Sequence, residues 1–209
     1  MKRLIFDLDN TLIKWKNEYI IDIKKTCEKY NLKIDSVQII YNILDETGEK
    51  YKILSKKTLL KEINKKCNTN LDMEFINTLF EGQYNSVDQD EEVIETLEYL
   101  SKKYNLVVLT NYFKEIQENR LINARIRDYF EEVYGGDEVY LKPHKEAFEK
   151  AIGDYDIKDC IMIGDDPVCD IKGAQDIGLK VIAVDYYNSL EDTNEYKIIR
   201  EFKELKEIL

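Results

Sequence analysis

Aspartates stand at two places where they could carry out chemistry on a phosphate ester. Asp7 and Asp9 follow one short apolar run, and Asp165 and Asp166 follow another after Gly164. Side chains two residues apart in an extended turn point the same way. The Asp7–Asp9 spacing therefore predicts a working pair. One carboxylate could attack a phosphorus atom, and the other could protonate the leaving oxygen and later activate water.

Groups that could bind a phosphoryl group stand at two further points of the chain. Thr110 supplies a hydroxyl donor, and the backbone N–H of Asn111 can join it around the phosphoryl oxygens. Lys142 precedes Pro143, which biases the lysine toward an extended conformation. The ammonium group of Lys142 would neutralise both a carboxylate nucleophile and the transferred phosphoryl group.

The elements that must position these residues alternate between apolar strands and amphipathic helices. Strands are predicted at 2–6, 106–109, 132–134, 160–163 and 180–184, with a weak one near 198–199. Helices are predicted at about 91–103, 114–124, 145–152 and 168–177, with a helical tail at 202–209. Continuous apolar strands that alternate with helices indicate an α/β fold, with a parallel sheet covered on both faces.

The carboxyl ends of parallel strands share one edge of the sheet, and ligands bind there where the strand order reverses. Strands ending at 6, 109 and 163 would therefore bring the polar groups together. Crowded carboxylates require a cation, and oxygen ligands without histidine suit Mg²⁺. The predicted acidic patch holds Asp7, Asp9 and Asp165, with Asp166 and Asp170 as further candidates.

The stretch from about Trp15 to Tyr84 has helical apolar spacing throughout. Breaks at Asn31, Gly48 and 68–70 divide it into four helices. We therefore expect two domains: a core from residues 1–14 and 88–209, and an all-helical insert from residues 15–87.

Composition excludes several classes of protein. The formal charge of −11 over 209 residues repels nucleic acid. No run approaches a membrane helix, and the N-terminus lacks the long apolar stretch of a secretory signal, so we expect a cytoplasmic protein. The single histidine, His144, is too few for a multi-histidine zinc site, and the four cysteines have no CxxC spacing.

In order along the chain, these segments resemble the four motifs of the haloacid dehalogenase (HAD) superfamily. The matching segments are 7–11, Thr110-Asn111, Lys142-Pro143, and 164–166 with Asp170. The resemblance implies a Rossmann-like doubly wound core, and the helical insert resembles the mobile cap of the helical-cap subgroup. It also implies dependence on Mg²⁺ and an aspartyl-phosphate intermediate.

By this resemblance Asp7 would be the nucleophile and Asp9 the general acid/base. The metal would be bound by the Asp7 carboxylate, the Asp9 backbone carbonyl and Asp165, while Asp170 would hold a metal-bound water or orient Lys142. The phosphate would be bound by Thr110, Asn111 and Lys142. Tyr112 departs from the pattern, because many relatives carry glycine there, and it could either narrow the pocket or only pack.

The leading hypothesis is a Mg²⁺-dependent phosphatase that hydrolyses a small phosphate monoester, such as a nucleotide, a sugar phosphate or phosphoglycolate. A sugar-phosphate mutase of the same superfamily is the alternative, and a non-catalytic phosphate-binding module is a more distant one. Dehalogenation needs neither a metal nor the second aspartate. Trp15 and His144 are expected to pack or cap rather than react, and the chain could be a monomer or a homodimer.

Overall fold

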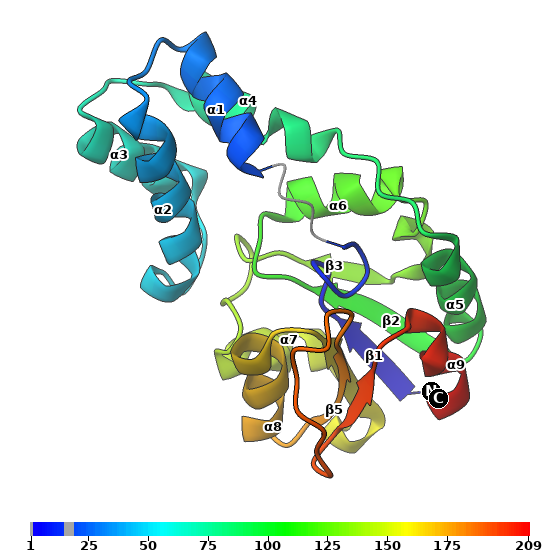
Figure 1. The fold of residues 1–209 in the computed structure, drawn as a ribbon. Helices are drawn as coiled ribbons and strands as arrows, with labels where there is room; N and C mark the ends of the chain where they lie inside the picture. Colours follow the sequence, from blue (N-terminus) through cyan, green and yellow to red (C-terminus); the bar gives the residue numbers. More distant parts are fainter. Residues whose placement is uncertain (1, 15–18) are drawn as a thin grey trace.

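The fold is built on a parallel six-stranded sheet, seen in a computed structural model that describes residues 2–14 and 19–209. The strand order is β3-β2-β1-β4-β5-β6, and each pair of neighbouring strands is parallel (Figure 1). The strands are β1 (Lys2–Phe6), β2 (Tyr104–Leu109), β3 (Glu132–Tyr134), β4 (Cys160–Gly164), β5 (Lys180–Val184) and β6 (Lys197–Ile199).

Helices cover both faces of this sheet. Alternate strand residues point to opposite sides, and on both sides they are apolar and buried. Leu4 and Phe6 join the apolar cluster under α5 (Glu91–Ser101), α6 (Lys114–Asn123) and α9 (Leu205–Ile208). Ile5 joins the opposite cluster, which includes α7 (Lys145–Ile152) and α8 (Gly173–Asp176). The predicted α/β fold, a doubly wound Rossmann-like core with a helical insert, is confirmed.

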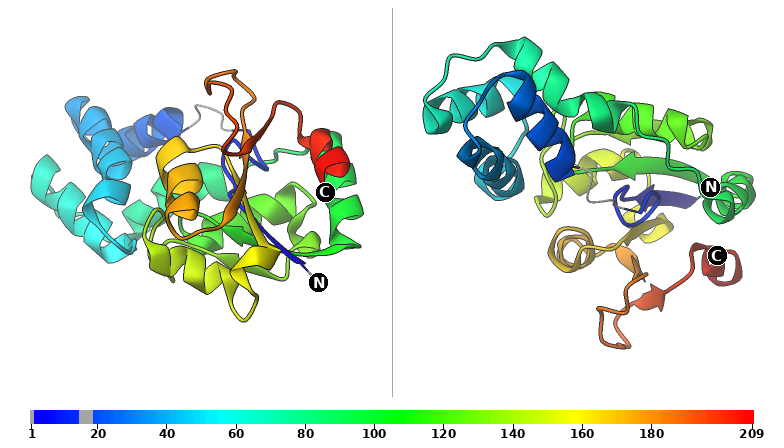
Figure 2. Two further views of the ribbon diagram at one scale, coloured as in Figure 1. Left: turned by 90° about the horizontal axis from the view of Figure 1, so that it is seen from below. Right: turned by 45° about the horizontal axis from the view of Figure 1, so that its top comes forward.

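Four helices lie between β1 and α5 and extend away from the sheet (Figures 1 and 2). They are α1 (Tyr19–Lys29), α2 (Asp35–Lys50), α3 (Lys56–Cys67) and α4 (Met73–Tyr84). The predicted break at Gly48 is wrong, since α2 continues to Lys50; one glycine costs a helix only about 1 kcal/mol. The domain limits at 15 and 87 stay a prediction, and Trp15 lies outside the described residues.

An apolar contact joins these four helices to the core. The ring of Phe80 on α4 lies 5.4 Å from that of Phe113 and 5.9 Å from that of Tyr112, between ring centroids. Two backbone hydrogen bonds add to it, from Leu54 N–H to the Gly136 carbonyl (2.7 Å) and from Leu141 N–H to the Lys52 carbonyl (2.8 Å). The insert therefore packs on the segments that follow β2 and β3.

The expected helix at 168–177 differs from the structure. The chain forms a π-helical segment, η3 (Pro167–Lys172), before the short α8. The chain is nevertheless helical without a break from Pro167 to Asp176, and its Gly173 packs closely on the loop before α7, because a Cβ there would lie 2.7 Å from the Cβ of Pro143. Short 3₁₀ segments also occur at η1 (Arg127–Tyr129), η2 (Ile157–Asp159) and η4 (Phe202–Glu204). Among the described residues, each helix is too short or too polar to cross a bilayer.

Truncation of Phe80 to alanine tests the contact between insert and core. Phe80 is buried, so we expect Phe80→Ala to cost about 3–5 kcal/mol locally and to speed amide exchange in α1–α4 far more than in the strands. Hydrogen exchange followed by mass spectrometry measures this. Ile21→Ala, which truncates an exposed side chain of α1, should leave exchange unchanged. Equal acceleration in the sheet would contradict the assignment.

Candidate active site

The ends of three neighbouring strands meet at one edge of the sheet. Asp7 directly follows β1, and its N–H donates to the carbonyl of Ile163 on β4 (2.9 Å). Thr110 directly follows β2, and its N–H donates to the carbonyl of Tyr134 on β3 (3.0 Å). Because β1 lies between β2 and β4, this edge is the point where strand order reverses, the usual ligand position in such sheets.

A tight turn follows Asp7 and sets the position of Asp9. Asn10 adopts a left-handed backbone conformation (φ 56°), which asparagine tolerates better than most residues. The carbonyl of Leu8 accepts hydrogen bonds from the N–H groups of Leu12 (2.9 Å) and Ile13 (3.0 Å). The turn reverses the chain at once, so Asp9 remains at the sheet edge, close to α6.

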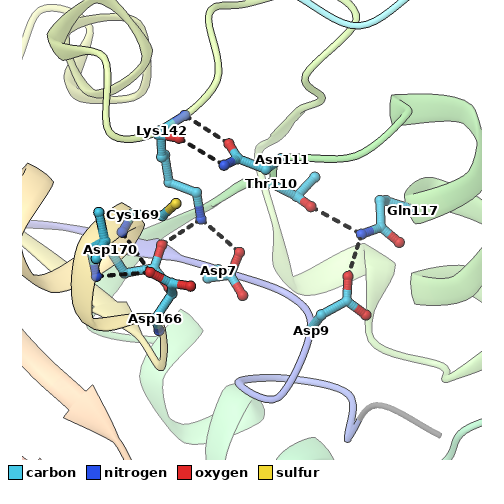
Figure 3. Close-up of polar contacts among 10 residues, drawn as sticks. Asp7, Asp9, Thr110, Asn111, Gln117, Lys142, Asp166, Cys169 and Asp170 are labelled. Carbon is cyan, nitrogen blue, oxygen red and sulfur yellow. Dashed lines mark hydrogen bonds and ion pairs between the residues drawn. The ribbon is translucent and has the colours of Figure 1, made fainter. Parts of the chain in front are cut away.

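Lys142 reaches this edge from the loop before α7. Its Nζ donates to Oδ1 of Asp7 and to Oδ1 of Asp170, at 2.6 Å each (Figure 3). The side chain of Asn111 binds the backbone of Lys142 at two points, accepting from its N–H (2.7 Å) and donating to its carbonyl (2.8 Å). Asn111 thus holds the lysine in place through its side chain, a role that we did not predict.

Burial and mutual repulsion perturb the acids. Desolvation raises the pKa of Asp7 well above its usual range; Lys142 lowers it in part, and Asp170 and Asp165 raise it further. Desolvation, with Asp170 next in size, raises the pKa of Asp165 to about 7. Burial alone would lower the pKa of Lys142, but Asp170 and Asp7 outweigh that effect and raise it. Burial therefore shifts the pKa of each of these three groups, and the contacts between them decide the direction for Lys142.

Three carboxylates of the cluster are close enough to share a cation. One oxygen from each of Asp7, Asp165 and Asp170 lies within 4.8 Å of the others. Gly164 makes this approach possible, because a Cβ there would lie 2.4 Å from Oδ2 of Asp170. A donor set made entirely of carboxylates suits a hard divalent cation.

Two acids near the cluster are turned elsewhere. Asp166, the alternative to Asp170, caps η3 by accepting hydrogen bonds from the N–H groups of Val168 (2.8 Å) and Cys169 (2.6 Å). The carboxylate of Asp9 faces α6, where it accepts from Arg120. Its predicted contribution to a metal, through the backbone carbonyl, stays a prediction.

A cavity of about 240 Å³ lies over these groups. Its lining consists of Asp7, Asp9, Asn10, Thr110, Asn111, Tyr112, Lys142, Asp165, Asp166, Cys169 and Asp170. A larger cavity of about 640 Å³ lies at the opposite edge of the sheet, near the first residues of β1, β5 and β6, but its lining lacks paired aspartates. The chemistry that the sequence predicts thus falls in the smaller cavity.

The structure locates Tyr112 and His144, whose roles the sequence left open, and adds two residues that it did not predict. Tyr112 lines the cavity and also packs, since its hydroxyl donates to Oε1 of Gln83 on α4 (2.8 Å). Both readings of Tyr112 therefore hold in part. His144 precedes α7 at the N-cap position without a side-chain capping bond, and its ring contacts Tyr140. Gln117 and Arg120, which contact Asp9, were missed, although their spacing of three on a helix after a motif strand was visible.

The fold and the acidic strand ends define a HAD-type hydrolase site, and comparison with known families agrees. The profile of the haloacid dehalogenase-like hydrolase family matches residues 4–184. This chain therefore belongs to that family, and the recognition made from its motifs is confirmed.

Relatives of this chain include phosphatases, and proteins of similar fold also include 2-haloacid dehalogenases. The glyceraldehyde 3-phosphate phosphatase of Pyrococcus furiosus is 32% identical over 55% of this chain. The match spans about half (52%) of that relative's own length. The pyrimidine 5'-nucleotidase PynA of Streptococcus pneumoniae is 24% identical, over 90% of this chain and 84% of its own. The HAD-hydrolase YfnB of Bacillus subtilis, solved with bound magnesium, has the same fold: TM-score 0.73 and 22% identity, over 99% of this chain and 97% of that one.

Removing the ammonium group of Lys142 tests how strongly the buried cluster depends on it. Lys142→Met leaves neighbouring buried carboxylates uncompensated, so we expect about 3–5 kcal/mol loss in the free energy of unfolding. Urea denaturation with a chelator present measures it. The matched control is Lys172→Met, which breaks an exposed ion pair with Asp176 and should cost under about 1 kcal/mol. Equal losses in the two variants would argue against a buried charge network.

Proposed function

We propose that this protein is a Mg²⁺-dependent phosphatase that hydrolyses small phosphate monoesters through an aspartyl-phosphate on Asp7. One observation carries the proposal: the Asp7 carboxylate is bound by the Lys142 ammonium group at 2.6 Å, beside two further carboxylates that could share a cation. A carboxylate that attacks phosphorus needs positive charge near both itself and the phosphoryl group, because the phosphoryl group is also an anion. Membership of a hydrolase family with phosphatase relatives supports the same reading.

In the first half-reaction an oxygen of Asp7 attacks phosphorus, and the bond from phosphorus to the ester oxygen breaks. Asp9 donates a proton to the departing oxygen, so that the product leaves as an alcohol. Thr110 and Lys142 donate hydrogen bonds to the phosphoryl oxygens as negative charge shifts onto them.

In the second half-reaction water attacks the phosphorus of the aspartyl-phosphate. Asp9, now a carboxylate, accepts the proton from that water, and the bond from phosphorus to the Asp7 oxygen breaks. Inorganic phosphate leaves and the Asp7 carboxylate is restored. Asp9 thus acts as acid in one step and as base in the next.

Asp7, Asp165 and Asp170 are the side chains that would hold Mg²⁺, with the Asp9 carbonyl as a further oxygen ligand. When bound, the ion would supply the positive charge that the carboxylates and the phosphoryl group require. The proximity of the three carboxylates supports this assignment, and burial together with the neighbouring aspartates raises the pKa values of Asp7 and Asp165.

The relatives suggest which leaving groups to test. Three-carbon phosphates, suggested by the Pyrococcus relatives, are the first candidates, and pyrimidine nucleotides, suggested by PynA, are the second. A sugar-phosphate mutase would instead depend on a bisphosphate activator.

Replacing the nucleophile tests the proposal directly. Asp7→Asn removes the attacking oxygen anion while keeping the shape of the side chain, so we expect kcat to fall by at least about a thousandfold. The measurement is release of inorganic phosphate from an aryl phosphate and from glyceraldehyde 3-phosphate, with Mg²⁺ present or chelated.

The matched control is Asp185→Asn. Asp185 is also a buried aspartate directly after a strand, but it accepts hydrogen bonds from Ser189 and Leu190 and lies outside the cavity lining. It should cost stability and leave kcat unchanged. An Asp7→Asn variant as active as the wild type, or a wild type inactive on both substrates with Mg²⁺, would refute the proposal.

The dependence of stability on Mg²⁺ should change with pH. Asp165 titrates at about 7 in the folded protein and near 3.8 when exposed, so the folded state binds its proton more tightly. The metal-free protein then loses stability as pH rises through this interval, and a bound cation offsets the loss. We expect Mg²⁺ to raise Tm by several degrees at about pH 8 and by much less at about pH 5.

Differential scanning fluorimetry at the two pH values measures this, with Asp165→Asn and Asp185→Asn as paired variants. Asp165→Asn should lose most of the Mg²⁺-dependent rise, and Asp185→Asn should keep it. A rise that is equal at both pH values, or retained in Asp165→Asn, would contradict a cation held by this carboxylate.

A further inference from the structure

Two polar side chains of α6 are buried beside the site. Gln117 is fully buried (0% exposed) and Arg120 is 6% exposed. They stand three residues apart, so they share one face of the helix. Neither has a part in the chemistry proposed above, and burying a guanidinium group and an amide is unfavourable unless their hydrogen bonds are satisfied.

Both side chains bind the carboxylate of Asp9. Nη1 of Arg120 donates to Oδ1 at 2.6 Å, and Nε2 of Gln117 donates to Oδ2 at 2.9 Å. Each oxygen of Asp9 is therefore held by its own donor, which fixes both the position of the carboxylate and its rotation.

The two donors are also joined to each other and to the phosphate-binding hydroxyl. Nη1 of Arg120 donates to Oε1 of Gln117 (2.8 Å), and Nε2 of Gln117 donates to Oγ1 of Thr110 (2.9 Å). Arg120 can only donate and Asp9 here accepts, so the amide of Gln117 has one possible orientation. Figure 3 shows the resulting chain from Thr110 through Gln117 to Asp9.

This series of hydrogen bonds joins Thr110 and Asp9, the two groups that must face opposite ends of the scissile bond between phosphorus and oxygen. Thr110 accepts from Gln117, so its own hydroxyl proton is available for a phosphoryl oxygen, while Asp9 must reach the leaving oxygen. We propose that Gln117 and Arg120 are positioning residues, which fix the Asp9 carboxylate for acid/base catalysis at a set place relative to Thr110. The inference rests on the proposed function, because it assigns Asp9 that role.

Neutralising a buried charge is a weaker explanation of the Arg120–Asp9 pair. The Asp9 side chain is 28% exposed, whereas that of Arg120 is 7% exposed. Water could therefore solvate Asp9 without help, and it is the arginine that loses solvent to form the pair. Arg120 gives up solvent to bind one oxygen of Asp9, and Gln117 binds the other oxygen. This arrangement is better explained by control of the orientation of the Asp9 carboxylate than by neutralisation of its charge.

Removing either donor should slow turnover more than it weakens binding. We expect Gln117→Met and Arg120→Met, which keep the length of the side chain, to lower kcat about 10–100-fold with KM within about threefold. Arg120→Lys keeps a donor and should recover part of the loss. Hydrolysis of glyceraldehyde 3-phosphate with Mg²⁺ provides the assay. A change in KM with kcat unaltered would overturn the proposal.

A double-mutant comparison separates positioning from general damage. In an Asp9→Asn background, Gln117→Met and Arg120→Met should cost at most about a further twofold in kcat, because they act through Asp9. Multiplicative losses would overturn the proposal. The control is Arg3→Met, which removes another buried arginine in a 2.6 Å ion pair, with Glu131, at the start of β1. It should lower stability and leave kcat unchanged; a kcat loss like that of Arg120→Met would also count against positioning.

Crystal structures supply a readout that is independent of activity. The wild type should keep Asp9 hydrogen-bonded to Gln117 and Arg120, and in Arg120→Met the carboxylate should rotate or become disordered. An unmoved Asp9 in the variant would overturn the proposal even in an active enzyme. A wild-type protein without turnover but with this geometry would instead refute the proposed function, so the two failures are distinguishable.

Discussion

Repulsion among carboxylates is the constraint on which this site depends. Asp7, Asp165 and Asp170 present oxygens within 4.8 Å of one another at a buried edge, in a protein whose formal charge is −11. Such a group of acids is stable only if positive charge is placed among them. Lys142 supplies one positive charge by binding Asp7 and Asp170, while burial, with the Asp170 charge next in size, raises the pKa of Asp165 to about 7. The close approach of the three carboxylates is unfavourable without a cation. The same close approach suits this edge to bind a cation and, together with the cation, an anionic substrate.

The surrounding structure serves to keep these charges in place. Asp7 is held by a backbone hydrogen bond to β4, and the Lys142 backbone is held by both side-chain atoms of Asn111. Glycine at position 164 leaves room for the Asp170 carboxylate, and Asp166 caps the π-helical η3, which begins at Pro167. These contacts are local and short, so the carboxylates cannot separate to relieve their repulsion without breaking several hydrogen bonds. Preorganisation of this kind is what a charged transition state requires.

Helix α6 links the two sides of the cavity. One of its faces carries Gln117 and Arg120 toward Asp9 and Thr110, while Ile116 and the preceding Phe113 pack with the four-helix insert. Tyr112, directly before Phe113, lines the cavity and donates to Gln83 of the insert. The segment that binds the Asp9 carboxylate is therefore also the segment on which the insert rests.

The sequence by itself determined the order of strands and helices, most of their limits, and the identity of the motif residues. These follow from apolar periodicity and from spacing along the chain, which are local properties; β1, β3, β5 and α7 have the predicted limits. Tertiary structure alone decided which acids meet. Lys142 bonds to Asp7 across 135 residues and to Asp170 across 28, Asp166 turns away to cap η3, and Asp9 faces α6. Such pairings depend on how side chains pack between distant segments, and no local pattern encodes that packing.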